Sequence, residues 1–196
     1  MVETNKVPWE RVLRASISGI LATIRHGTED YTYAIPSRRQ PPSKEIIFPS
    51  MIDTKFKVLV VVDTSGSMSE KDLGAALKQI KEIVERAGVE AIVAAGDWDL
   101  QRMKEVKDRV KWRALEKVLV GGGGTDMVKV AKEAMEKAKN KVGLIVILTD
   151  GETTWEGFDD LLKVPVVVGI INNPSAVSKV PKLRKVRVVE IETKGR

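Results

Sequence analysis

The sequence of 196 residues has no cysteine, and this absence excludes several kinds of chemistry at once. Disulfide bonds, thiolate metal sites and cysteine nucleophiles all need a residue that the chain does not have. Histidine occurs once, as His26, so a zinc site of the His-Glu-x-x-His type is excluded as well. We therefore expect the chemistry of this chain to rest on oxygen ligands or on binding surfaces.

Long apolar runs are also absent, and none approaches the roughly twenty residues that a membrane-spanning helix needs. The amino terminus, Met-Val-Glu-Thr-Asn-Lys, does not resemble a signal peptide. Hydrophobic residues make up 43% of the chain and charged residues 31%, proportions that are typical of a soluble globular protein. We expect one cytoplasmic domain with no membrane partner. Abundant Lys, Glu and Val without cysteine also resemble the composition of thermophile proteins.

Acidic residues are fewer than basic ones, which leaves a net charge of +6. Much of the excess lies near the carboxyl terminus, within residues 179–196. Such a basic segment could bind nucleic acid or an acidic partner, or it could protect an edge strand from pairing with other chains. The second interpretation is favoured, because the segment has no interleaved aromatic residues on which bases could stack.

The most informative stretch is an apolar run that ends abruptly in polar residues. Residues 58–62, Val-Leu-Val-Val-Val, are typical of a parallel strand buried on both faces. Asp63, Ser65 and Ser67 follow in the pattern Asp-x-Ser-x-Ser. Open α/β sheets place their sites at the carboxyl ends of the strands. A carboxylate and two hydroxyls at that point suit a hard cation such as Mg²⁺.

Two further segments have a similar character. Residues 142–148 form a second buried-strand pattern, which leads into Thr-Asp-Gly with Asp150 at its centre. Four glycines at 121–124 precede Thr125 and Asp126. The glycines could cradle a phosphate before a helix, but the lysine that completes a P-loop does not follow them. We interpret them as a flexible loop that lets Thr125 approach a cation, and Asp126 as the cap of the next helix.

Together these segments resemble a von Willebrand factor A (VWA) domain. The metal-ion-dependent adhesion site (MIDAS) of that family combines Asp-x-Ser-x-Ser with a later loop Thr and a later strand-terminal Asp. The matching positions in this sequence are Asp63, Ser65, Ser67, Thr125 and Asp150. The resemblance implies a bound Mg²⁺, with Mn²⁺ or Ca²⁺ as alternatives, and a partner protein that offers an Asp or Glu to the metal.

The resemblance extends upstream of the first strand. A Trp-bearing helix, the Pro-Ser-Arg-Arg segment at 36–39 and the Asp-Thr-Ser-Gly-Ser motif are similar to one particular VWA-like domain. That domain follows a zinc-metallopeptidase-like domain in prokaryotic proteins of unknown function. The context makes an ATPase or a metallopeptidase-type subunit a candidate partner. The peptidase activity itself is not implied for this chain, because its His-Glu-x-x-His motif is absent.

Apolar periodicity and Gly or Pro breaks divide the chain into alternating helices and strands. Helices are predicted near 8–26, 69–87 and 127–139, with a short one near 112–119. Strands are predicted at 57–62, 89–95, 142–148, 164–171 and 186–191, and the resemblance adds an antiparallel edge strand within 98–110. The alternation predicts a doubly wound, Rossmann-like α/β fold with a mainly parallel sheet. Residues 1–56 would add an N-terminal helix and an extended arm packed over the sheet, and residues 57–196 would form the VWA-like domain.

At the predicted site, hydroxyls of Ser65, Ser67 and Thr125 would bind the cation directly. Asp63 and Asp150 would ligate it or hold metal-bound waters. A cation with mainly neutral ligands keeps positive charge for a carboxylate from another protein.

The rim of this site is predicted to contain five further residues, namely Trp155, Glu152, Gly123, Gly124 and Asp126. An exposed Trp155 would be a hot spot for a partner. The alternative is that Trp155 folds onto its own loop.

The leading functional prediction is a Mg²⁺-dependent protein-interaction module without catalytic residues. The first alternative is a Mg²⁺-dependent phosphotransfer or phosphatase-like enzyme with Asp63 as nucleophile. Such enzymes carry a second Asp two residues later, where this chain has Ser65. A basic nucleic-acid-binding domain is the second alternative, and it rests only on net charge.

Overall fold

The computed structural model describes residues 8–36, 49–53, 56–65, 70–96, 100–106, 126–138 and 142–193. Its centre is a six-stranded sheet with the order β5-β4-β3-β6-β7-β8. The strands are β3 (Lys57–Asp63), β4 (Glu90–Gly96), β5 (Leu100–Val106), β6 (Val142–Thr149), β7 (Val166–Ile171) and β8 (Val186–Ile191). β5 is antiparallel to β4, and all other neighbouring pairs are parallel. The predicted doubly wound, mainly parallel fold is confirmed, including its antiparallel edge strand.

The central strands are apolar because both of their faces are covered. In β3, Val58, Val60 and Val62 belong to one hydrophobic core, and Leu59 and Val61 belong to the other. All five side chains are completely buried. Successive side chains of a strand point to opposite faces, so a strand between two cores needs an unbroken apolar run. This explains why the first polar residue stands where the strand ends.

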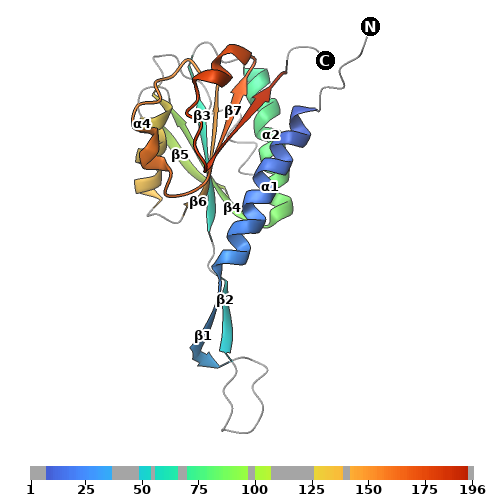
Figure 1. Ribbon diagram of the computed structural model, residues 1–196, viewed down its shortest axis with the longest axis vertical. Helices are drawn as coiled ribbons and strands as arrows, with labels where there is room; N and C mark the ends of the chain where they lie inside the picture. The colour runs from blue at the N-terminus through green and yellow to red at the C-terminus, as the bar shows by residue number, and fades with distance from the viewer. Residues whose placement is uncertain are drawn as a thin grey trace.

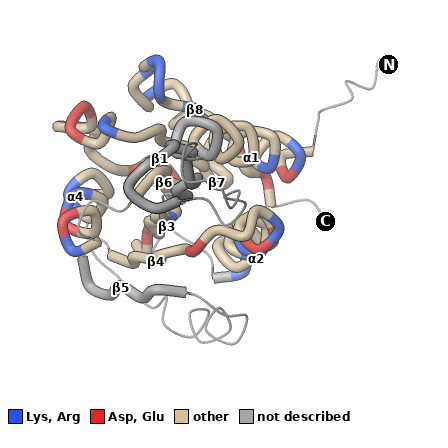
Figure 2. The backbone as a smooth tube through the Cα atoms, turned by 90° about the horizontal axis from the view of Figure 1, so that it is seen from below, with Lys and Arg blue, Asp and Glu red and all other residues tan. Residues whose placement is uncertain are grey.

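Helices cover both faces of the sheet, as Figure 1 shows. One face carries α1 (Trp9–Thr28) and α2 (Glu70–Ala87). The other carries α4 (Met127–Lys137) with the short 3-10 helices η1 (Phe158–Leu161) and η2 (Pro174–Lys179). In Figure 2, α1 and α2 lie together on the opposite side of the sheet from α4. The predicted short helix near 112–119 lies outside the described residues.

The N-terminal helix α1 belongs to the domain core. It packs beside α2 and against the face formed by β6, β7 and β8. Leu13, Ile17, Ile20 and Leu21 recur at intervals of four, three and one residues and are all buried, which is the pattern of one apolar helix face. Among the described helices, none combines the length and the apolar character that crossing a bilayer requires.

Part of the arm that follows α1 forms a two-stranded sheet of its own. It contains an antiparallel hairpin of β1 (Glu29–Pro36) and β2 (Pro49–Asp53), which extends away from the sheet below α1 (Figure 1). The prediction places the arm over the sheet; in the structure, β1 and β2 take each other as hydrogen-bonding partners and not a strand of the six-stranded sheet. β2 leads towards the start of β3, so the hairpin leaves from the end of the domain opposite to Asp63.

Candidate metal centre

Asp63 is the last residue of β3 and is completely buried. Both of its carboxylate oxygens accept hydrogen bonds. The backbone N–H of Ser65 donates to Oδ1 at 2.9 Å, and the hydroxyl of Thr149 donates to Oδ2 at 2.7 Å. The second bond joins the ends of β3 and β6, which are neighbours in the sheet. The carboxylate is therefore held in one orientation.

Burial raises the pKa of Asp63 above its ordinary value, because the charged form loses its hydration. Hydrogen bonds from Ser65 and Thr149 lower this pKa, and the charge of the nearby Asp150 raises it again. The carboxylate is thus well held, but its negative charge is incompletely compensated. A cation at this edge of the sheet would supply the missing compensation.

The residues after Asp63 bring hydroxyl groups to the same edge. Ser65 and Thr64 are both buried, and the backbone N–H of Thr64 donates to the carbonyl of Gly96 at 3.3 Å, at the end of β4. The hydroxyl of Thr64 is buried and has no hydrogen-bond partner among the described residues. Buried polar groups are rarely left unpaired, so an orphaned hydroxyl here is consistent with a site that a ligand completes.

Asp150 follows β6 directly and is buried. Its Oδ1 accepts a hydrogen bond from the backbone N–H of Glu152 at 3.0 Å. Its main-chain carbonyl accepts one from the side-chain amide of Asn173 at 2.9 Å. Among the described residues, no group donates to Oδ2. Because β3 and β6 are parallel neighbours, Asp150 and Asp63 lie at the same edge of the sheet, as the motif predicts.

Several residues of the predicted site and rim lie outside the described residues, namely Ser67, Thr125, Gly123 and Gly124. Their roles as hydroxyl ligands and as a flexible loop stay predictions. Asp126 is described, and its carboxylate accepts a hydrogen bond from the backbone N–H of Lys129 at 3.0 Å. Asp126 is therefore the N-cap of α4, which confirms that interpretation.

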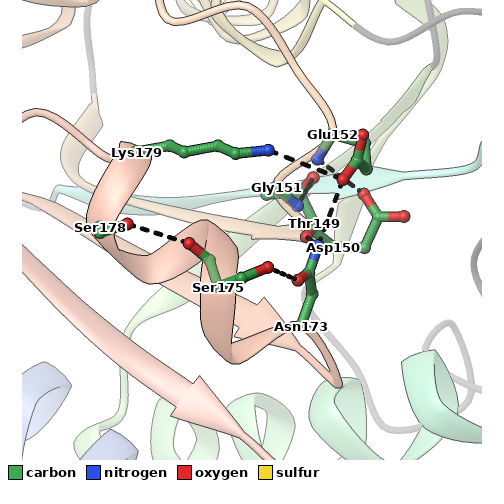
Figure 3. A network of polar contacts seen from close by, with 8 residues as sticks. All are labelled: Thr149, Asp150, Gly151, Glu152, Asn173, Ser175, Ser178 and Lys179. Atoms are coloured by element: carbon green, nitrogen blue, oxygen red, sulfur yellow. Dashed lines mark hydrogen bonds and ion pairs between the residues drawn. The ribbon is translucent and has the colours of Figure 1, made fainter.

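Glu152 lies beside Asp150 on the loop that follows β6. Its side chain is exposed and lies 3.8 Å from the amino group of Lys179 and 3.4 Å from the amide of Asn173 (Figure 3). An exposed ion pair of this kind contributes little free energy. The structure thus places Glu152 at the border of the candidate metal edge, the end of the sheet that carries Asp63, Ser65 and Asp150, with its carboxylate directed towards η2.

Trp155 is half-buried rather than exposed. Its ring packs edge-on against Phe158 with the ring centroids 5.4 Å apart, and it contacts the core that α4 covers. Its indole N–H is buried and has no hydrogen-bond partner in the part of the chain that the structure describes. Of the two alternatives for Trp155, the structure shows the ring folded onto its own loop.

The donor set at this edge suits a divalent cation that prefers oxygen ligands. In the part of the chain that the structure describes, no group of three His, Cys, Asp or Glu residues could hold a metal by itself. A metal here would depend on hydroxyls together with Asp63 and Asp150, and Ser65 supplies one such hydroxyl. Oxygen-only sets with carboxylates are what Mg²⁺ and Mn²⁺ favour. The residues present therefore fit such an ion.

Two residues at this edge have no role in the predictions from sequence. Thr149 is completely buried, and its hydroxyl donates to Asp63 and accepts from the N–H of Gly151 at 3.0 Å. Asn173, after β7, holds the carbonyl of Asp150. The same sequence feature could have identified both residues, because each is a polar residue at the carboxyl end of an apolar strand.

A family model described as a VWA-like domain (DUF2201) matches residues 58–190, which run from β3 to β8. The chain belongs to this VWA-like domain family. An uncharacterised protein of Thermotoga maritima is 35% identical over 102 residues. The match covers 50% of this VWA-like chain and 23% of the Thermotoga protein, so the chain spans only a part of that relative.

A solved VWA structure resembles this VWA-like domain in its fold. The crystal structure of the SpRpn10 VWA domain aligns with a TM-score of 0.50 over 72% of this chain and 90% of that one, at 11% identity. The manganese-loaded TRAP protein of Plasmodium vivax aligns with a TM-score of 0.46 over 70% of this chain and 69% of its own, at 14% identity. At such low identity, the likeness to the SpRpn10 domain shows a shared fold alone.

Proposed function

We propose that this VWA-like domain binds Mg²⁺ or Mn²⁺ and, through the ion, a carboxylate of another protein. The observation that carries the proposal is the arrangement of Asp63, Ser65 and Asp150 at one buried edge of the sheet. Neither carboxylate forms an ion pair with a basic side chain among the described residues. Two buried acidic groups without a basic partner favour a site for a cation.

Each residue has its own role in this proposal. Ser65 and, by prediction from the motif, Ser67 and Thr125 would ligate the ion through hydroxyl oxygens. Asp63 would act through its charge and by orienting Ser65, since both of its oxygens already accept hydrogen bonds. Asp150 has one oxygen open for ligation or for a metal-bound water. When bound, the ion would supply positive charge and an open coordination position for the partner's carboxylate.

The alternatives receive less support. A nucleophilic Asp63 would need an oxygen that reaches a substrate, yet the side chain is completely buried and both oxygens are hydrogen-bonded. The basic residues Lys182, Arg184 and Arg187 are exposed at the start of the edge strand β8, where positive charge discourages pairing with other chains. We therefore prefer the interaction module to an enzyme or a nucleic-acid-binding domain.

Isothermal titration calorimetry with Mg²⁺ and Mn²⁺ tests the metal half of the proposal. The wild-type protein should bind, and Ser65→Ala should weaken binding by about tenfold or more, because it removes a direct ligand. Asp159→Asn changes an exposed carboxylate on η1 and is the matched control, which should bind as the wild type does. If the wild-type protein shows no binding at millimolar metal, the proposal is wrong.

The partner half needs a separate experiment. Affinity purification from the source cell should be done with Mg²⁺ and again with chelator, using the wild type and Ser65→Ala. A partner that depends on the metal edge should be retained only by the wild type with Mg²⁺. A partner retained in all conditions would place the interface elsewhere. The basic surface around residues 182–187 would then be the better candidate, and its binding should weaken steeply with salt.

A further inference from the structure

Asn173 stands at the N-terminal end of η2 but does not cap that helix with its side chain. Asparagine is among the residues preferred at helix N-caps, where its oxygen accepts a backbone N–H of the first turn. Here the side chain reaches across to a different part of the chain. Its Nδ2 donates to the carbonyl of Asp150 at 2.9 Å and lies 3.4 Å from Oε1 of Glu152 (Figure 3).

The orientation of the Asn173 amide is determined by its surroundings. The hydroxyl of Ser175 donates to Oδ1 at 2.7 Å, which leaves Nδ2 to face the carbonyl of Asp150. A carbonyl accepts hydrogen bonds only, so the reverse orientation of the amide would lose the bond to Asp150 and would turn Oδ1 towards the carboxylate of Glu152. The hydroxyl of Ser178 in turn donates to the carbonyl of Ser175 at 3.0 Å. The polar groups of η2 thus hold the amide in one direction.

The short helix η2 also packs against the loop that carries Asp150. Gly151 has a φ of +80°, and a Cβ at this position would overlap the Cβ of Ala176 in η2. On the other side, the N–H of Gly151 donates to the hydroxyl of Thr149 at the end of β6. The loop that carries Asp150 is therefore held from one side by the sheet and from the other side by η2.

We infer that Asn173 is a positioning residue for the metal edge. By holding the carbonyl of Asp150, it fixes the backbone from which the open oxygen Oδ2 projects, without itself contacting the cation. Loss of this hydrogen bond should leave the fold intact but let Asp150 move relative to Asp63. The inference deepens the proposed function and, for its effect on metal affinity, rests on it.

The test compares Asn173→Leu, which keeps roughly the same shape without polar atoms, with Asn173→Ala and the wild type. In the metal-free proteins, the backbone N–H groups of Gly151 and Glu152 should exchange with solvent about threefold to tenfold faster in both variants, as expected for one lost hydrogen bond. In calorimetry with Mn²⁺, both variants should bind about tenfold to a hundredfold more weakly, the range found when residues that orient metal ligands are removed.

Lys179→Met is the matched control, because it removes the exposed contact of Lys179 with Glu152 and leaves Asn173 in place. Its exchange rates and its Mn²⁺ affinity should stay within about twofold of the wild type. Unchanged exchange of both N–H groups in Asn173→Leu and Asn173→Ala would overturn the inference, as would unchanged Mn²⁺ affinity in a wild type that binds. A wild type that binds no Mn²⁺ would refute the proposed function, while faster exchange in the variants would still support the positioning of Asp150.

Discussion

Gly151 lies directly after Asp150 at the candidate metal edge, and Gly151→Ala should destabilise the protein by about 2–5 kcal/mol. Its φ of +80° belongs to the left-handed region, where a side chain costs roughly 1–2 kcal/mol. The added methyl would also overlap the Cβ of Ala176 and lie 3.3 Å from Cδ1 of Ile170. Overpacking of this kind typically costs about 1–3 kcal/mol, and the two costs add.

Two other glycines separate these contributions. Gly88, after α2, has a φ of +65° but no atom within 4 Å of its Cβ position, so Gly88→Ala should cost only the backbone part, about 1–2 kcal/mol. Gly74 lies inside α2 with no atom within 4 Å, so Gly74→Ala should stabilise the protein by up to about 1 kcal/mol. In the double variant, Ala176→Gly should recover only the stability that Gly151→Ala loses through steric overlap, once the effect of Ala176→Gly by itself is subtracted.

Urea denaturation in the presence of chelator measures these differences without any contribution from bound metal. Changes in the midpoint at a constant dependence on urea report changes in the free energy of unfolding. The reasoning is refuted if Gly151→Ala costs no more than Gly88→Ala, because η2 would then not press against the loop. The reasoning is also refuted if adding Ala176→Gly recovers none of the stability that Gly151→Ala loses.

Three further predictions concern the same region. Asp63→Asn should abolish cation binding in calorimetry, yet leave the metal-free protein at least as stable as the wild type near neutral pH, because burial raises the pKa of Asp63 and penalises its charged form. A carboxyl whose pKa is raised by folding contributes stability that is present below its unfolded pKa and lost as the pH rises through its folded pKa. The stability advantage of the Asn variant should therefore shrink as the pH falls towards the ordinary value of 3.8. An advantage that grows on acidification would contradict this. Thr149→Val removes a hydrogen bond to a charged group, so it should cost about 1.5–3 kcal/mol in urea denaturation and weaken Mn²⁺ binding, and a neutral result in both assays would exclude the role assigned to Thr149. Trp155→Phe removes a buried N–H that has no partner among the described residues, and it keeps a ring against Phe158, so stability should change by less than about 1.5 kcal/mol. A larger loss would show that the N–H is paired in solution.

Local sequence patterns were sufficient to predict most of the sheet and part of the candidate metal edge. The apolar run at 58–62 could be satisfied only between two cores, which predicts a central strand. Asp63 and Asp150 both follow such runs, and parallel strands bring their carboxyl ends to one edge of a sheet. The placement of Asp63 and Asp150 at one edge of the sheet can therefore be predicted from the apolar runs that precede them and from the parallel arrangement of their strands. The structure shows both carboxylates at this edge.

The predictions that stayed open depend on packing that the local sequence does not fix. The apolar residues of the arm indicate that it needs a partner, but they do not say whether that partner is the sheet or a second strand. The same holds for Trp155, whose ring could face solvent or Phe158. In both cases the local sequence is compatible with two arrangements, and the packing of the whole molecule selects one.

By itself, the sequence determined the order of the elements and the oxygen-bearing side chains after β3 and β6, since these follow from periodicity and from the residues at strand ends, and its motif resembled that of the family. Only the tertiary structure decided which groups hold those ligands. Thr149 bonds to Asp63 across 86 positions, and Asn173 bonds to the carbonyl of Asp150 across 23. Such bonds require that β3, β6 and β7 lie side by side, and strand order is set by the burial of the whole sheet between its helices rather than by any local segment.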